Sequence, residues 1–278
     1  MTTIVFVLLI FAVSVAAGLL GVLTGLGGGV VLIPALVLLF HVDIHFAMGA
    51  SLIAVITNSS AAAPTFMAKG LSNLRIGLFL ETAAAVGAIV GAILVAFVPT
   101  SYIGTLLGVV LLYSAYLSSR QRDDLPSDKP SDPLAVRLQM EGEYPGVDGI
   151  REYRVYNVLT GTGLLGVAGL LSGLLGIGSG AVKVLAMDRI MRLPYKISTT
   201  TSNFIIGITA AASAGVYFSR GYIDPGLTMP VMLGVLAGST FGARVLIRAR
   251  SRVLRIIFVI VIAALGIQMV LKSLFGLF

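Results

Sequence analysis

Long apolar runs separated by short polar breaks dominate the pattern of this chain. Ten runs can be marked, five before and five after one long polar stretch. Most approach the ~20 residues that cross a ~30 Å hydrocarbon core as an α-helix. None shows the alternation typical of membrane barrels, so helices are the expected spanning elements. The runs cover residues 3–24, 26–40, 45–67, 74–98, 101–118, 156–175, 177–188, 197–218, 223–247 and 253–275.

The composition agrees with a membrane location. The 278 residues are 57% hydrophobic and 11% charged, whereas soluble chains average about 25% charged residues. The first run lacks a preceding basic region and continues without a polar break, so we interpret it as a retained membrane segment and not as a signal peptide. The net charge of +7 is spread between apolar runs, which argues against nucleic acid as a partner. We therefore predict an all-α, polytopic membrane protein.

The polar stretch divides the chain into three parts. Residues 119–155 combine acidic and basic side chains with several prolines, a composition that favours a solvent-exposed linker over a folded domain. The predicted division is an N-terminal transmembrane repeat at 1–118, a polar linker at 119–155 and a C-terminal transmembrane repeat at 156–278.

An internal repeat relates the two halves at a constant offset of 151 residues, without gaps. Glycines, one serine and a basic residue followed by glycine recur in register over 67 residues, from Gly25 to Gly91 in the first half. The matched positions are Gly25, Gly27 and Gly29 with Gly176, Gly178 and Gly180; Ser51 with Ser202; Lys69 with Arg220; and Gly87 and Gly91 with Gly238 and Gly242.

Basic residues near membrane ends mark the cytoplasmic side. They gather in the linker and in the loops on its side of the membrane, which places the linker in the cytoplasm and both termini outside. Each half crosses five times, or three times if its first two segments form a re-entrant hairpin. Either number is odd, so two copies in sequence must point in opposite directions and form an inverted repeat.

Two glycine clusters begin the short second segments, 26–40 and 177–188, at matching positions of the two halves. Interrupted helices at such positions indicate the substrate site of a transporter. Helix N-termini that start there would offer free N–H groups to an anion. Close helix packing is the alternative explanation, and we favour it for Gly87, Gly91, Gly238 and Gly242. The cluster residues assigned to the site are Gly27, Gly28, Gly29, Gly178, Ser179 and Gly180.

Polar side chains follow each cluster. Ser51 and Asn58 in the first half, and Thr201, Ser202 and Asn203 in the second, could donate hydrogen bonds to sulfonate, carboxylate or sulfite oxygens. Serine and threonine in membrane helices also bond to their own carbonyls, so a structural role is the alternative for each.

Two charged residues lie inside apolar runs. Lys183 follows the second cluster by one turn, and we assign it either as a counter-charge for an anionic substrate or as a snorkelling or carboxylate-paired side chain. Glu81 either carries a coupling proton or pairs with Arg75 or Lys183. The histidines form no ligand cluster, so no metal is expected. No nucleophile has a membrane histidine as its base and no ATP-binding motif is present, so we expect neither an enzyme nor a cofactor.

The sequence GLGGGVVLIP at 25–34, Ser51 after an alanine, GIGSG at 176–180 and TSN at 201–203 resemble the sulfite exporter TauE/SafE family of membrane permeases. The resemblance covers both halves but not the linker. It implies a bacterial or archaeal cytoplasmic-membrane carrier of small sulfur-containing anions. The second copy departs from the first, with Ser179, Lys183 and Leu185 in place of Gly28, Leu32 and Pro34, so the two half-sites are chemically unequal.

We therefore predict a secondary transporter, an exporter by the family's name, that moves sulfite or an organosulfonate by alternating access at a midplane site between the repeats. H+ or Na+ is the expected coupling ion, and membrane lipid surrounds the chain. The glycine-rich faces would also permit a homodimer. An anion channel and a non-transport membrane assembly protein are the alternatives.

Overall fold

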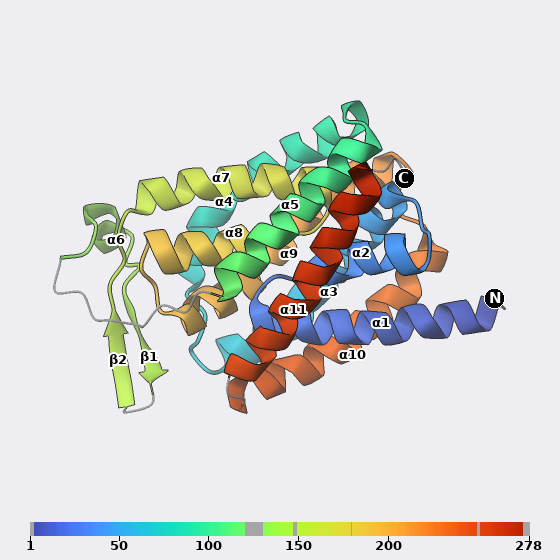
Figure 1. Cartoon of the computed structure of the whole chain (residues 1–278). Helices are drawn as coiled ribbons and strands as arrows, with labels where there is room; N and C mark the ends of the chain where they lie inside the picture. The colour runs from blue at the N-terminus through green and yellow to red at the C-terminus, as the bar shows by residue number, and fades with distance from the viewer. Residues whose placement is uncertain (1–2, 120–129, 147–148, 179, 249–250, 275–278) are drawn as a thin grey trace.

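The computed structural model describes residues 3–119, 130–146, 149–178, 180–248 and 251–274. Each apolar run of the sequence contains one long or short helix (Figure 1). The first half holds α1 (Thr3–Thr24), α2 (Gly29–Leu39), α3 (Ile44–Met67), α4 (Leu74–Leu94) with a 3-10 turn η1 (Val95–Phe97), and α5 (Thr100–Ser119). The second half holds α7 (Val158–Leu175), α8 (Gly180–Leu185), a π-helical turn η2 (Ala186–Ile190), α9 (Tyr195–Ser219), α10 (Pro225–Arg248) and α11 (Ser251–Leu274).

Helix length separates spanning from short elements. Within the described residues, six helices are long and apolar enough to cross a membrane, namely α1, α3, α4, α7, α9 and α10. By contrast, α2 has 11 residues, and α8 with η2 covers the same length in the second half. At 1.5 Å per residue such an element is about 16 Å long, or half of the hydrocarbon core. The chain is thus a polytopic all-α membrane protein with short helices after its glycine clusters, as predicted.

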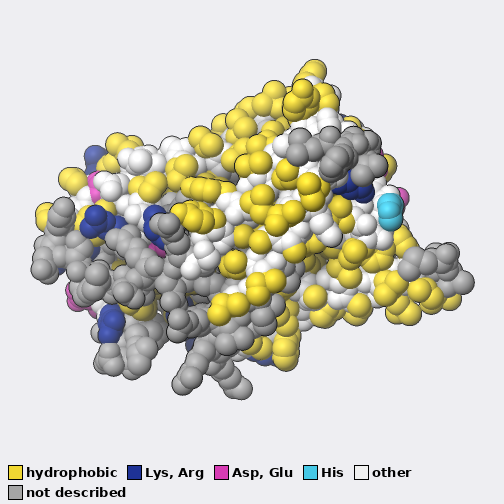
Figure 2. All heavy atoms as spheres, in the orientation of Figure 1, with side chains coloured by type: hydrophobic (Ala, Val, Ile, Leu, Met, Phe, Trp, Pro, Cys, Tyr) yellow, Lys and Arg dark blue, Asp and Glu magenta, His cyan; other side chains and the backbone are white. Residues whose placement is uncertain are grey.

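The outer surface is suited to lipid. Apolar side chains cover most of the bundle in Figure 2, and even large ones such as Phe97, Leu159 and Val86 are 76%, 69% and 65% exposed. Patches of this extent are rare on soluble monomers. Lys and Arg side chains gather mainly at the end of the molecule that carries the linker (Figure 2).

The helix boundaries repeat at the offset found in the sequence. Gly29–Leu39 matches 180–190, and Ile44–Met67 matches 195–218. The backbone repeats as well. His41 and Arg192, which occupy equivalent positions of the two halves, both adopt a positive φ that side-chain-bearing residues rarely take, at 55° and 57°. The two halves therefore share one fold.

Helix pairing shows how the two copies are arranged. α1 packs along α10, and the matching α7 packs along α4; α3 pairs with its own counterpart α9, and α5 with α11. If each helix is replaced by its counterpart in the other half, α1 by α7 and α4 by α10 for example, the same set of helix pairs results. The colours in Figure 1 show that α5 and α11 run in opposite directions, as do α1 and α7. The start of α1 and the end of α11 lie away from the linker. These relations are those of an inverted repeat.

The linker is more ordered than its composition predicts. It contains helix α6 (Pro133–Arg137) and an antiparallel hairpin of β1 (Gly142–Gly146) and β2 (Gly149–Tyr153). Ala135, Met140 and Tyr153 are buried in one cluster with side chains of α4, α7, η2 and α9. The expectation of an exposed linker is therefore wrong for this part, because a few scattered apolar residues suffice to dock it and produce no periodic pattern.

Hydrogen bonds attach the linker to both halves. Asn73, the N-cap of α4, donates from Nδ2 to the Met140 carbonyl at 2.8 Å and to the Tyr153 hydroxyl at 2.7 Å. Burial raises the pKa of Tyr153, so this hydroxyl stays neutral at physiological pH. The Asp132 carboxylate accepts the backbone N–H of Val158, the first residue of α7, at 3.0 Å.

Glycines allow the paired helices to touch backbone to backbone. A Cβ on Gly91 of α4 would lie 2.8 Å from the Leu174 nitrogen of α7. A Cβ on Gly238 of α10 would lie 2.9 Å from the Val15 carbonyl carbon of α1. Gly87 and Gly242 lie in similarly close contacts. The packing role predicted for these four glycines is confirmed.

Gly91→Ala should therefore destabilise the protein, whereas Gly163→Ala should not. The first substitution forces α4 away from α7 at a cost of about 1–3 kcal/mol, whereas nothing lies within 4 Å of a Cβ on Gly163 of α7. Thermal unfolding of the detergent-purified protein, followed by circular dichroism, measures both. Equal midpoints for Gly91→Ala and wild type would contradict the close packing.

Candidate functional site

Each glycine cluster forms a turn that ends one helix and starts a short one. Gly25, Gly27 and Gly28 have φ of 75°, 83° and 71°, and Gly176 and Gly178 each have φ of 65°. Side-chain-bearing residues rarely adopt this left-handed conformation. The sequence therefore places glycine where the backbone requires it, and the predicted helix breaks are confirmed. Ser179 lies outside the described residues.

The two turns meet around one pair of equivalent side chains. A Cβ on Gly27 would lie 2.8 Å from Ile206 Cδ1 and 3.3 Å from Val55 Cγ1; one on Gly178 would lie 3.0 Å from atoms of both side chains. Val55 and Ile206 are themselves equivalent by the repeat, and both are fully buried. The glycine turns thus face each other across the pseudo-two-fold axis in the middle of the bundle.

Further contacts close this centre from both halves. Gly29 is the first residue of α2, and a Cβ there would collide with Ser51 Oγ and lie 3.1 Å from the Ile177 carbonyl oxygen. A Cβ on Gly180, the counterpart of Gly29, would lie 2.6 Å from Leu26 Cα. Gly27, Gly28 and Gly29 of the first turn, and Gly178 and Gly180 of the second, are buried.

Ser51 is a predicted site residue that lies against the first residue of α2, Gly29. Its Oγ is fully buried and has no hydrogen-bond partner among the described residues. A buried polar group without a partner is costly. Ser51 belongs to α3, and its hydroxyl lies beside the N-terminus of α2. It is therefore available to bind a ligand there.

Thr201, Ser202 and Asn203 bond to the first half of the chain. Ser202 Oγ donates to the Gly25 carbonyl at 3.0 Å, and Asn203 Nδ2 donates to the Val22 carbonyl at 2.9 Å. Both carbonyls belong to the segment where α1 ends. Thr201 faces α4 instead, where its Oγ1 accepts the Asn73 N–H at 3.0 Å. Ser202 and Asn203 therefore support the first glycine turn, and Thr201 lies apart from it.

Asn58 lies on α3 beside α10. Its Oδ1 accepts a bond from Ser239 Oγ at 2.7 Å, while its Nδ2, also buried, has no partner among the described residues. The equivalent residue of the second half is Thr209, which the sequence reasoning missed. Applying the repeat to Asn58 would have indicated it.

Thr209 belongs to a buried charged network together with the two charges of the apolar runs. Lys183 Nζ lies 2.5 Å from Glu81 Oε2, and the Thr209 hydroxyl accepts a bond from Lys183 and donates one to Glu81 Oε1. Lys183 and Thr209 are fully buried and Glu81 is 3% exposed. Of the alternatives considered for each charge, the structure shows the pairing of Lys183 with Glu81, while Arg75 bonds Gln139.

The network joins Glu81 of the first half to Lys183 and Thr209 of the second, and the repeat does not duplicate it. The positions that match Lys183 and Glu81 in the other half are Leu32 and Met232, which are apolar. The halves therefore supply the same backbone around the centre but different electrostatics.

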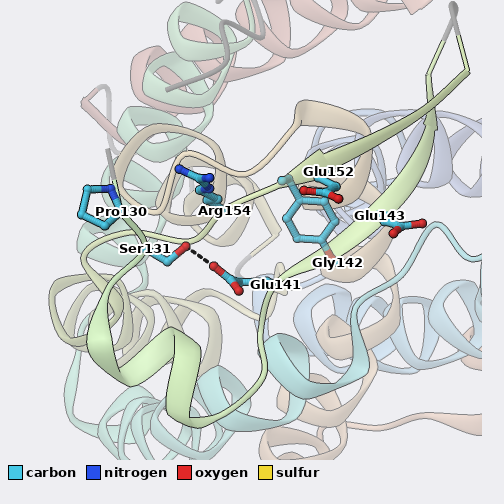
Figure 3. Close-up of a pocket in the computed structure, with 8 residues that line it drawn as sticks. Pro130, Ser131, Glu141, Gly142, Glu143, Glu152 and Arg154 are labelled. Atoms are coloured by element: carbon cyan, nitrogen blue, oxygen red, sulfur yellow. Dashed lines mark hydrogen bonds between the residues drawn. The ribbon is translucent and has the colours of Figure 1, made fainter. Parts of the chain in front are cut away.

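A separate pocket of about 580 Å³ lies on the linker (Figure 3). Glu143 and Glu152 face each other across the hairpin, and Glu141 accepts a bond from Ser131. None of the predicted site residues lines this pocket. Three carboxylates beside Arg154 also make it unsuited to an anion.

Two inverted halves with broken helices around a buried polar centre define a membrane transporter. The chain belongs to the family described as "Sulfite exporter TauE/SafE", which it matches over residues 10–269. It is thus a membrane transporter of the TauE/SafE type and not an enzyme.

Curated relatives agree. The chain is 29% identical over 240 residues to "Probable membrane transporter protein YdhB" of Bacillus subtilis, covering 86% of this chain and 88% of the relative. It is 24% identical over 278 residues to "Probable membrane transporter protein YunE" of the same organism, covering 98% and 99%. A protein of Methanocaldococcus jannaschii, "Probable membrane transporter protein MJ0441", is 23% identical, with 95% of each chain covered. No solved structure matches the chain.

Removing one partner of the buried ion pair should destabilise the protein strongly. Glu81→Gln leaves the Lys183 charge uncompensated, which costs about 3–5 kcal/mol. The double variant Lys183→Leu with Glu81→Met carries the residues of the repeat-related positions Leu32 and Met232 and should regain most of that loss, because apolar replacement of a buried pair is often neutral. Thermal unfolding by circular dichroism compares the variants. A double variant no more stable than Glu81→Gln would rule out the pair as the cause.

Proposed function

We propose that the protein is a secondary carrier of a small anion, sulfite or an organosulfonate, that works by alternating access around the paired glycine turns. One observation carries the proposal. The fully buried hydroxyl of Ser51 lies without a partner among the described residues at the N-terminus of α2, beside the second glycine turn. A hydrogen-bond donor and a helix N-terminus at one point favour an anion.

Other groups near the centre fit the same ligand. The free Nδ2 of Asn58 is a donor on the same helix as Ser51, about two turns further on. Lys183 lies one turn after Gly180, and its amino group can supply a positive charge near the second turn. Sulfite and sulfonates present three oxygens that accept several such donors. The family description supports sulfur oxyanions as the substrate class.

The arrangement supports a carrier over a channel. Both turns are buried, and Val55 and Ile206 fill the space between them. A continuous pore would need an open path here, whereas two equivalent halves can rock so that one side opens at a time. Export is the direction that the family's name favours.

The distribution of charge supports an orientation in the cytoplasmic membrane. Lys69 and Arg192 in loops, and Arg75 and Lys196 in the first turns of α4 and α9, lie on the side of the linker, while Arg220 and Lys272 lie at the opposite end. Basic residues favour the cytoplasmic side. The linker is therefore assigned to the cytoplasm, and both ends of the chain to the outside.

Anions that bind the site should stabilise the folded protein. At about 100 times its Kd, a ligand that binds only the folded state adds about 2.7 kcal/mol. We expect sulfite or a sulfonate to raise the unfolding temperature, whereas chloride at equal ionic strength should not. The panel also includes sulfate, sulfoacetate, taurine and carboxylates. No selective shift across the panel would argue against a sulfur-anion carrier.

Ser51→Ala should weaken binding of the active anion. Hydrogen bonds to charged groups contribute about 1.5–3 kcal/mol, or roughly 10- to 100-fold in Kd. Ser219→Ala is the matched control, because this exposed hydroxyl bonds the Val216 carbonyl at the end of α9. Unchanged affinity in Ser51→Ala would refute its role. Counterflow in proteoliposomes, absent from a channel, then tests the carrier mechanism.

A further inference from the structure

We propose that the protein binds one proton together with each anion, and that Glu81 accepts this proton when Lys183 turns to the anion. The inference rests on the proposed function and adds the co-transported ion and its binding site. It starts from the network of Lys183, Glu81 and Thr209, which joins α8, α4 and α9.

The geometry ties the charge of one partner to the state of the other. The Lys183 ammonium and the Glu81 carboxylate lie 2.5 Å apart, and Thr209 bridges them by accepting from the first and donating to the second. All three are shielded from solvent. An isolated charge is unfavourable in such a place, so the occupied states are those in which the charges balance.

Two charge-balanced states matter for transport, one without the anion and one with it. With no anion bound, the ionised carboxylate neutralises the ammonium. When an anion enters, it would meet that carboxylate as a like charge, and the site would carry one excess negative charge. Protonation of Glu81 removes the excess, because the bound anion then neutralises Lys183. Proton and anion therefore strengthen each other's binding to the same degree.

The network is close enough to the glycine turns for this exchange. Ile206, which touches Gly27, Gly178 and Gly180, lies one helical turn before Thr209 on α9. One turn is about 5 Å along the axis. Lys183 lies three residues after Gly180 on α8. Its flexible four-carbon side chain allows the ammonium to move between Glu81 and a ligand at the turns.

Other ionisable groups on the packed elements are engaged elsewhere. Arg75, earlier on α4, is exposed and bonds Gln139. On η2, Asp188 and Arg189 lie 3.8 Å apart as a pair. Tyr217, two turns beyond Thr209 on α9, donates to the Gly173 carbonyl at 3.0 Å.

The remaining neighbours add no titrating partner. The sequence of α7 contains no ionisable residue. Lys196 and Tyr195 lie at the first turn of α9, more than three turns before Thr209. Tyr153 of the linker bonds Asn73. Within the described part of the chain, the Lys183–Glu81 pair is therefore the unit that exchanges a proton as an anion arrives.

The difference between the halves fixes the stoichiometry at one proton. Leu32 and Met232 occupy the equivalent positions and cannot titrate. One proton thus accompanies one anion, and both move in the same direction. Export follows when the outward gradient of the anion exceeds the inward gradient of the proton.

Proton uptake during anion binding is the direct test. The probe is methanesulfonate, a monovalent anion whose own charge does not change between about pH 5 and pH 9, a range in which buried carboxyl groups and lysines titrate. Titration of the wild-type protein in weak buffer should show about one proton taken up per bound anion. At low pH the unliganded pair can already hold the additional proton on Glu81. At higher pH it does not, and there the Kd for the anion should rise about tenfold per pH unit.

Variants assign the proton to the pair. Glu81→Gln removes the carboxylate that would accept the proton, so any proton that this variant takes up with the anion must go to Lys183, and the anion should raise its unfolding temperature. Lys183→Leu with Glu81→Met should bind at least tenfold more weakly and take up no proton. Asp188→Asn, which removes an acidic group outside the network, should keep wild-type uptake.

The outcomes separate the two proposals. Anion binding in wild type without proton uptake and without pH dependence would overturn the coupling and leave the carrier proposal standing. No binding of any tested anion would overturn the carrier proposal itself. If Glu81→Gln does not fold, proton uptake by wild type against the double variant still decides the question.

Discussion

The structure depends on one constraint, which is that the backbone N–H and C=O groups of interrupted helices must find hydrogen-bond partners inside the bilayer. A helix that stops within the hydrocarbon region leaves N–H and C=O groups that lipid cannot bond. Here two such stops face each other, and each is covered by the opposite half. Ser202 and Asn203 bond the carbonyls at the end of α1, and Val55 and Ile206 pack against both turns. The inverted pairing of the halves supplies these contacts, so the interrupted helices are tolerated. The same pairing brings their polar groups together in the centre of the bundle.

Duplication and divergence contribute different things to that centre. The shared fold supplies two short helices, two left-handed glycine turns and a common axis. The ion pair is not duplicated, because the positions equivalent to Lys183 and Glu81 hold Leu32 and Met232. A perfectly symmetric site would place two buried ion pairs around the axis, at twice the desolvation cost. A single ion pair keeps the electrostatic function, while Asn58, the residue equivalent to Thr209, accepts a bond from Ser239 of the second half.

The sequence predicts features that depend on local periodicity and leaves unspecified those that depend on partners. Run length and the constant offset between the halves are enough for the helices, the breaks and the inverted copies. Gly91 and Gly238 could be assigned to packing from their spacing alone. Lys183 and Glu81 could be singled out as charges in apolar runs, but their pairing across 102 residues is a tertiary contact. The docking of the linker was missed because Ala135, Met140 and Tyr153 are buried by side chains from four other elements.

The bonds between the halves also have a consequence for synthesis. The carbonyls of Val22 and Gly25 receive their partners from residues made 181 and 177 positions later. At about 5–20 residues per second, the ribosome needs roughly 10 to 35 s to supply them. For that time the nascent first half holds an interrupted helix whose native partners do not yet exist. Its first turn must remain in contact with water or with the insertion machinery, so membrane integration of this protein cannot proceed helix by helix into lipid.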